Sequence, residues 1–391
     1  MMNDPRAEAP SNPVSPVPFK SSTSKSVFKI IFGITAALIA LLLGLIVLLL
    51  IGVETGPIAL LIGLVSATLP VPLYLMLVLW IDRYEAEPFW MLATAFFWGA
   101  LVAVFFAYLI NTASGLIVTI LTNDVRAGAA FGAVISAPIV EESAKALILF
   151  IFFFFKKDEF DGVIDGIVYA AMVGLGFAMT ENIQYYGRAV MQAGGGGLTI
   201  VFIIRGALAP FSHPMFTSLT GIGLGLARQS RNMAVKLITP IFGLLAAISM
   251  HSIWNGSAVI FGPGGFILAY ILIMVPAFFI MFVVIALALR REGQIVREYL
   301  TPDFQSGILQ PHEYKQLGSI WGRMGASYNA FSRGGVRSWQ ACRQLNQTAS
   351  ELAFHRSRLA RGITVANAAE REAAYRTALE DLLRQLRGGG N

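Results

Sequence analysis

Long apolar runs recur along this chain, and they set the first limit on what it can fold into. A helix needs about 20 residues to cross the hydrocarbon layer of a bilayer, which is ~30 Å thick. We place eight such runs at residues 28–52, 57–81, 89–121, 129–155, 163–187, 198–227, 236–261 and 265–289. They predict an all-α polytopic membrane protein, built as a bundle of about eight transmembrane helices.

The charge composition agrees with this prediction. Only 13% of the residues are charged, whereas a soluble domain carries about 25%. The net charge of +6 would suit a nucleic-acid partner, but the basic residues gather in loops and in the tail. Lysine and arginine accumulate on the cytoplasmic side of membrane proteins, so the positive charge indicates a lipid bilayer as the partner and excludes nucleic acid.

The loops between the runs alternate in charge. Basic loops and flanks hold Lys20, Lys25, Lys29, Arg83, Lys156, Lys157, Arg228, Arg231, Lys236, Arg290 and Arg291. The loops between them hold Arg126 and Arg188. By the positive-inside rule, an even number of spans then places both termini in the cytoplasm. We therefore expect a multi-pass protein of the cell membrane with this orientation.

The two ends of the chain differ from the apolar centre. Residues 1–26 are rich in proline and serine and predict a disordered cytoplasmic lead. Residues 27–290 form the predicted transmembrane domain. Residues 291–391 are polar and predict a helical cytoplasmic tail, or a helix on the membrane surface. The last helix repeats apolar residues every three or four positions: Tyr375, Ala378, Leu379, Leu382, Leu383 and Leu386.

Two adjacent glutamates, Glu141 and Glu142, interrupt the fourth apolar run. A carboxylate near the centre of a bilayer costs at least ~2.5 kcal/mol on insertion scales. Lys145 follows Glu141 by four residues, which is the favourable helical spacing for a Glu–Lys pair. Two carboxylates beside one ammonium suit a general base or a shared proton. The alternative is a structural ion pair that holds helices together.

Other polar residues lie inside the later runs. Glu181 and Asn182 are in the fifth, and His213, bracketed by Pro210 and Pro214, is in the sixth. Prolines at this depth indicate a broken helix that lines a cavity or packs on protein.

In the seventh run, His251 and Asn255 share one helix face and could donate to a developing oxyanion. For each of these groups, hydrogen bonding between helices is the alternative to a role in chemistry. Counted from the ends of the runs, the groups lie at similar depths, which favours a shared pocket that opens outward.

Four ordered motifs resemble the PrsW family of intramembrane proteases, which is related to the CAAX prenyl endopeptidases. They are Glu-Glu-x-x-Lys at 141–145, Gly-Phe-x-x-x-Glu-Asn at 176–182, His-Pro at 213–214 and His-x-x-Trp-Asn at 251–255. The segment 82–88 also looks like that family. The resemblance covers roughly residues 55–290 and makes the transmembrane domain protease-like.

The resemblance implies roles for the residues and a class of substrate. Glu141 would be the general base with Glu142 as its partner, although the sequence does not separate the two. His213, His251 and Asn255 would orient water and stabilise the oxyanion, supported by Lys145, Glu181 and Asn182. The substrate would be a single-span membrane protein, such as an anti-sigma factor, cut during stress signalling.

The sequence lacks His-Glu-x-x-His, so we expect water activated by glutamate and no cofactor. Zinc held by one glutamate and two histidines is the alternative that we favour less. Two other functions stay open: a proton-coupled transporter, since carboxylate–histidine chains also carry protons, and a non-catalytic membrane scaffold.

Overall fold

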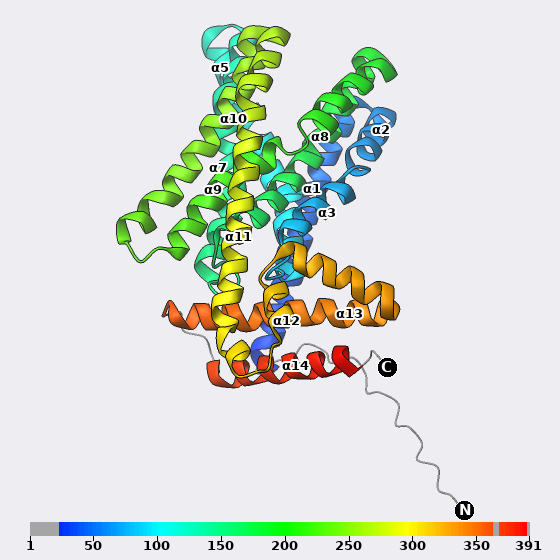
Figure 1. Cartoon of the computed structure of the whole chain (residues 1–391). Coiled ribbons are helices and arrows are strands. Elements are labelled where there is room, and N and C mark those ends of the chain that lie inside the picture. Colours follow the sequence, from blue (N-terminus) through cyan, green and yellow to red (C-terminus); the bar gives the residue numbers. More distant parts are fainter. Residues whose placement is uncertain (1–22, 363–366, 389–391) are drawn as a thin grey trace, which may run out of the picture. The chain divides into compact units, whose positions relative to one another are not determined.

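The computed structural model describes residues 23–362 and 367–388, which form helices and turns without a strand (Figure 1). The all-α class predicted from the apolar runs is confirmed. The chain divides into a membrane unit, residues 33–292, and a tail unit, residues 1–32 with 293–391. The disordered lead predicted for residues 1–26 lies outside the described residues, except for its last four, which begin helix α1 (Thr23–Thr55).

The membrane unit contains α1 from residue 33 onward, α2 to α10, and α11 up to residue 292. Their bounds are α2 Pro57–Thr68, α3 Val71–Ile81, α4 Phe89–Phe97, α5 Val104–Thr122, α6 Val125–Phe131, α7 Ala137–Phe155, α8 Val163–Phe202, α9 Ser212–Gln229, α10 Met233–Ala269 and α11 Val275–Gln305. Four π-helical turns join successive helices: Trp98–Ala103, Gly132–Ser136, Ile203–Leu208 and Tyr270–Met274.

Five helical segments of the described chain are long and apolar enough to cross a membrane: Ile30–Thr55, Pro57–Ile81, Phe89–Thr122, Val163–Gln229 and Met233–Gln305. The last two contain 67 and 73 residues, about three times the length that one crossing needs. Residues 125–155 are a further helical segment, in which Glu141, Glu142 and Lys145 raise the charge.

Both very long segments fold back on themselves at a glycine. Gly194 (φ 59°) and Gly262 (φ 64°) adopt the left-handed backbone region that a residue without Cβ enters readily. The rings of Tyr186 and Phe202 lie 5.7 Å apart, whereas sixteen residues of straight helix would span ~24 Å. Trp254 and Phe266 lie 4.6 Å apart across the second bend. Each segment therefore runs back along itself as two helical stretches, and the count of about eight membrane spans stays a prediction.

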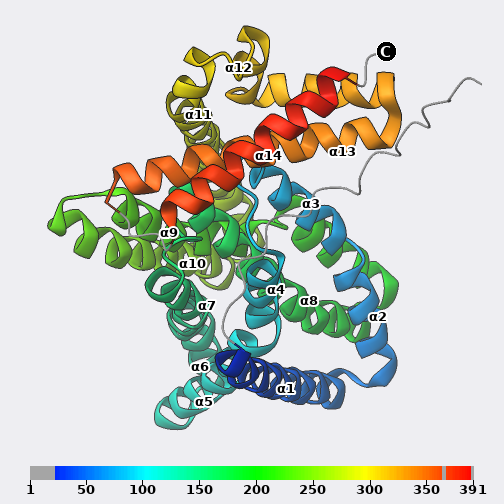
Figure 2. The ribbon, with the colours of Figure 1, turned by 90° about the horizontal axis from the view of Figure 1, so that it is seen from below.

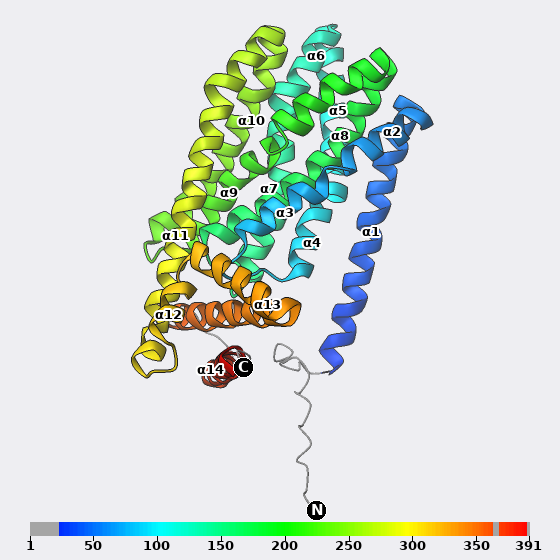
Figure 3. The same cartoon turned by 45° about the vertical axis from the view of Figure 1, so that its right-hand side comes forward.

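Helix α8 is the centre of the membrane unit. Helices α2 and α3 pack along one side of α8, and α9 lies between α8 and α10 (Figures 1 and 2). Figure 3 shows α10 and α11 rising side by side. Small residues allow this close packing: a Cβ on Gly166 would lie 2.1 Å from the carbonyl oxygen of Gly221, so the backbones of α8 and α9 touch. This contact brings the polar residues of α8 and α9 within reach of one another.

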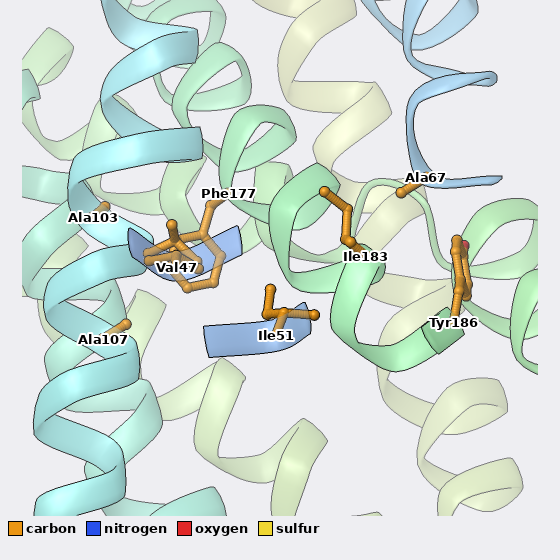
Figure 4. Packing of buried hydrophobic residues seen from close by; sticks show 9 residues of the cluster. Val47, Ile51, Ala67, Ala103, Ala107, Phe177, Ile183 and Tyr186 are labelled. Carbon is orange, nitrogen blue, oxygen red and sulfur yellow. The ribbon is translucent and has the colours of Figure 1, made fainter. Parts of the chain in front are cut away.

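An apolar cluster fixes α1, α2 and α5 against α8 (Figure 4). Phe177 and Ile183 of α8 are buried beside Val47 and Ile51 of α1, while Ala103 supplies a small surface at the end of the π-helical turn before α5. Alternation of large and small side chains fills the space between helices at the density of a protein interior. The cluster holds α8 in place one turn away from its polar residues.

In the tail unit, α12 (Pro311–Leu317), α13 (Ile320–Ala360) and α14 (Ala368–Gly388) follow the end of α11. Helix α13 reverses at Gly335 (φ 64°) and forms two arms. The predicted apolar stripe lies on α14, where Leu379, Leu382 and Leu383 are buried. Arg387 of α14 pairs with Glu313 of α12. The apolar face of α14 therefore packs within the tail unit.

Acidic side chains gather where the loop between α3 and α4 meets the start of α8. The Glu87 amide donates to Asp82 Oδ2 at 2.8 Å, and the Tyr169 hydroxyl donates to the Glu87 carboxylate. Burial raises the pKa of Asp82 from 3.8 to about 7, although the bond from Glu87 opposes the shift. Burial and the nearby Asp165 raise the pKa of Glu87 well above its usual range.

We expect Asp82→Asn to stabilise the protein at pH 8 and to have little effect at pH 4. Between about pH 4 and pH 7, folded Asp82 keeps a proton that the unfolded chain releases, so stability falls as the pH rises through this window. At pH 8 the ionised carboxylate costs at most ~4 kcal/mol. Thermal unfolding in detergent at both pH values measures the effect, and an equal gain at pH 4 and pH 8 would contradict it.

Candidate active site

Six polar side chains from four helices meet inside the membrane unit, and five of them are buried while Glu181 is half-buried. Glu141, Glu142 and Lys145 lie on α7, Glu181 on α8, His213 on α9 and His251 on α10. Glu142 and Lys145 are fully buried, and His251 is 1% exposed. Groups of this kind are retained at such depth only when they are paired, so the contacts among them define what the site can do.

Breaks in two helices place the site residues. Pro138 stands in the first turn of α7, directly after the π-helical turn Gly132–Ser136. Because proline has no amide hydrogen, it cannot bond the preceding turn, and the helix changes register there. The predicted break around His213 is also present, since residues 209–211 are not helical and α9 begins at Ser212. His213 therefore lies in the first turn of a helix, with Pro214 beside it.

The Lys145 ammonium occupies the centre of the cluster. Its Nζ lies 2.9 Å from Glu142 Oε1, 3.4 Å from Glu141 Oε2 and 3.1 Å from His213 Nδ1. It also lies 3.8 Å from the centre of the Phe177 ring. An ammonium can only donate, so His213 Nδ1 accepts from it and Nε2 carries the ring proton. One cation thereby partners two carboxylates and an imidazole.

Each histidine is oriented by its own carboxylate. His213 Nε2 lies 2.9 Å from Glu181 Oε2, and His251 Nδ1 lies 3.0 Å from Glu142 Oε1. Glu142 Oε2 also accepts from the Thr217 hydroxyl at 2.9 Å. The second ring nitrogen of His251, Nε2, faces Glu141 Oε2 at 4.0 Å. A carboxylate behind each imidazole is the arrangement that fixes ring orientation in metal sites.

The donor set fits a divalent transition metal. One donor atom each from Glu141, His213 and His251 lie within 4.8 Å of one another. Donors around tetrahedral zinc stand ~3.4 Å apart at metal–ligand distances of ~2.0–2.2 Å, so the triad would have to contract. His213 Nδ1 would also have to exchange the Lys145 ammonium for the metal. Two imidazoles and one carboxylate are a known zinc ligand set, and Glu142 and Glu181 supply the supporting carboxylates.

Two predicted residues lie outside this central group. Asn182 accepts a hydrogen bond from Arg205, which also pairs with Glu181. Asn255 donates from Nδ2 to the Ala133 carbonyl at 2.9 Å, so it ties α10 to the π-helical turn before α7. The oxyanion role expected for Asn255 stays a prediction.

Sequence reasoning missed two residues that touch the glutamates. Thr217 follows His213 by one helical turn and binds Glu142. Asn111 of α5 donates to Glu141 Oε1 at 3.4 Å, while its Oδ1 accepts from Ser136 at 2.8 Å. The amide of Asn111 inside an apolar run could have indicated a site residue. Thr217 gave no such indication, because threonine is common in membrane helices.

The family of the chain follows from its sequence relatives. A sequence model described as PrsW family intramembrane metalloprotease matches residues 87–281, which include every member of the cluster. The chain belongs to the PrsW family. The family predicted from the four motifs is confirmed, and with it the peptidase class of that family.

Three relatives, each named Protease PrsW, illustrate the similarity. The protein of Geobacillus kaustophilus is 35% identical over 149 residues, which cover 38% of this chain and 58% of the relative. The Oceanobacillus iheyensis protein is 27% identical over 236 residues, 60% of this chain and 97% of the relative. The Bacillus subtilis protein is 33% identical over 163 residues, 40% of this chain and 66% of the relative. No solved structure matches the chain significantly.

The expectation of no cofactor is wrong. The PrsW family is described as a family of metalloproteases, and Glu141, His213 and His251 form a possible metal-binding triad. The sequence hides this triad because its members come from three helices, so no local metal-binding motif exists. The donor set and the carboxylates behind both histidines agree with the family description.

Lys145→Met should destabilise the membrane unit by about 3–5 kcal/mol, because it leaves buried carboxylates without their cation. Thermal unfolding in detergent measures this effect. Lys156→Met is the matched control, since Lys156 is exposed at the end of α7 and stands over Trp90. Adding Glu142→Gln to Lys145→Met should recover part of the loss. Equal stability of wild type and Lys145→Met would contradict the central role of this ammonium.

Purified protein should contain one transition-metal ion per chain, measured by elemental mass spectrometry. His213→Ala and His251→Ala should each abolish this content, and Glu181→Gln should weaken metal affinity roughly ten- to a hundredfold through loss of ring orientation. His312→Ala, in the exposed part of the tail unit, is the control. Unchanged metal content in both histidine variants would place the ion elsewhere.

Proposed function

We propose that this chain is an intramembrane endopeptidase that hydrolyses a peptide bond of a membrane-protein substrate. The observation that carries the proposal is the arrangement of two carboxylate–imidazole pairs around Glu141. Glu142 holds His251 and Glu181 holds His213, so the pairs present fixed ring nitrogens to one buried place. Membership of the PrsW family supports the same reaction class.

Glu141 is the proposed base. Its Oε1 faces the Asn111 amide at 3.4 Å, and its Oε2 faces Lys145 and His251 at 3.4 Å and 4.0 Å. Glu142 is a poorer candidate, because Lys145, His251 and Thr217 all bond to it. A carboxylate with long, weak contacts is free to take a proton, whereas one with three short bonds is better suited to orienting its neighbours.

In the proposed reaction, Glu141 takes a proton from water as the water oxygen attacks the scissile carbonyl carbon. The carbon–nitrogen bond then breaks, and the leaving amine takes the proton back from Glu141. One carboxylate oxygen of Glu141, together with His213 and His251, would hold the metal, and the other oxygen would take the proton. The metal would polarise the carbonyl and lower the pKa of water. Lys145 and the Asn111 amide are the donors beside Glu141 that can stabilise the developing negative charge.

We propose single-span membrane proteins as the substrates, with anti-sigma factors of stress signalling as one candidate. A buried site in a membrane unit suits a substrate that reaches it from within the bilayer. We also retain the orientation with both termini in the cytoplasm, which rests on the alternation of basic loops along the sequence.

Glu141→Gln should lower the cleavage rate by a factor of about 10²–10⁴ without unfolding the protein, since the amide cannot accept the proton. Membrane-protein fragments are compared between cells with wild type, Glu141→Gln or Glu54→Gln. Glu54 is the matched control, because it pairs with Arg188 away from the cluster. Fragments should be lost only in Glu141→Gln.

Each rival function predicts a different result. A proton-coupled transporter would give solute uptake driven by a pH gradient and no difference in fragments. A scaffold would keep its function in Glu141→Gln. Identical fragments in cells with wild type, Glu141→Gln and Glu54→Gln would contradict the peptidase proposal.

A further inference from the structure

The first arm of α13, residues 320–334, turns its large apolar side chains outward. Trp321 is 78% exposed, Tyr328 is 72% exposed and Phe331 is 53% exposed, and Met324 is exposed between them. Their spacing of three, four and three residues places all four on one face of a helix. A helix of a water-soluble protein buries its apolar face. The first arm exposes that face instead, which is unfavourable if water alone surrounds it.

Contacts on the opposite face of the first arm explain why its aromatic side chains point outward. Ser327 lies 3.9 Å from Cys342 of the second arm, and the Arg323 guanidinium donates to Ser350 at 2.7 Å. Small and polar residues thus join the two arms, whose ribbons are seen in Figure 2. Because these contacts fix the rotation of the helix about its axis, the aromatic residues cannot turn inward without breaking them.

The segment around this face carries only positive charge. Residues 314–350 contain Lys315, Arg323, Arg333, Arg337 and Arg343 and no aspartate or glutamate. Arg333 and Arg337 are exposed on either side of the bend at Gly335. An aromatic face flanked by arginines is complementary to an interface that is apolar below and negatively charged above.

We propose that the first arm of α13 binds the anionic surface of a lipid bilayer, with Trp321, Tyr328 and Phe331 inserted among the headgroups. Two observations favour lipid over a protein partner. The charge is one-signed over 37 residues of sequence, which suits a sheet of phosphates, and the same chain is already anchored in a bilayer by its apolar helices. This inference does not depend on the peptidase activity.

The test uses the full chain reconstituted in vesicles of phosphatidylcholine alone or with about 30% phosphatidylglycerol, an anionic fraction at which surface potential matters. Cys342, the single cysteine, is replaced by alanine, and Tyr328→Cys carries an environment-sensitive fluorophore. Gln344→Cys, on an exposed position of the second arm, is the matched control. Lipids that carry a quencher in the acyl chain report contact with the bilayer.

We expect the label at 328 to be quenched in anionic vesicles and the label at 344 to stay in water. Arg333→Gln with Arg337→Gln should weaken the bound state about 25-fold, at roughly fivefold for each arginine, and high salt should act in the same direction. If the alanine at 342 disturbs folding, acyl-chain quenching of Trp321 is measured as the difference between wild type and Trp321→Tyr.

Two results would overturn the proposal. A label at 328 that stays in water in both kinds of vesicle would leave the aromatic face without a lipid contact. Equal shielding in detergent without anionic lipid would show that protein, from this chain or a second copy, covers the face.

Discussion

The Lys145 ammonium holds together groups that would otherwise repel one another in a medium of low polarity. It lies between Glu141 and Glu142 of its own helix and reaches His213 at the start of α9. An unpaired charge at this depth is far more costly than a paired one, so α7 and α9 are linked by a contact that neither can give up. Glu142 extends the link to His251 on α10, and His213 extends it to Glu181 on α8. Four helices are thereby connected through one cation.

Local patterns in the sequence predicted a large part of this arrangement. The spacing of Glu141 and Lys145 is helical, and the apolar surroundings showed that both had to be paired. Prolines 210 and 214 predicted the break that precedes α9. The apolar runs predicted membrane-spanning helices because span length is set by bilayer thickness, which acts on each run separately. Features that depend on one residue or one helix were therefore visible in the sequence.

Features that depend on how helices meet were not visible. Nothing in the sequence assigns Glu142 to His251 and Glu181 to His213, because these pairs join residues 109 and 32 positions apart. Zinc was the less favoured alternative for the same reason, since the ligands of the triad come from α7, α9 and α10 and leave no short motif. Asn255 shares a face with His251, yet its amide bonds to the Ala133 carbonyl, because the π-helical turn brings that oxygen near. The reversals at Gly194 and Gly262 are likewise local breaks whose outcome is set by packing.

The glycine contact between α8 and α9 has a mechanical consequence. No side chain lies between Gly166 and Gly221, so the two backbones are in direct contact. Sliding one helix along the other would bring larger residues into this contact and cause a steric clash. Glu181 of α8 and His213 of α9 therefore lie on helices that cannot shift past each other at this contact. Room for an extended polypeptide would have to come from displacement of α7 or α10. These helices are joined by the bond between Glu142 and His251, and the turn before α7 is joined to α10 by the bond from Asn255 to the Ala133 carbonyl.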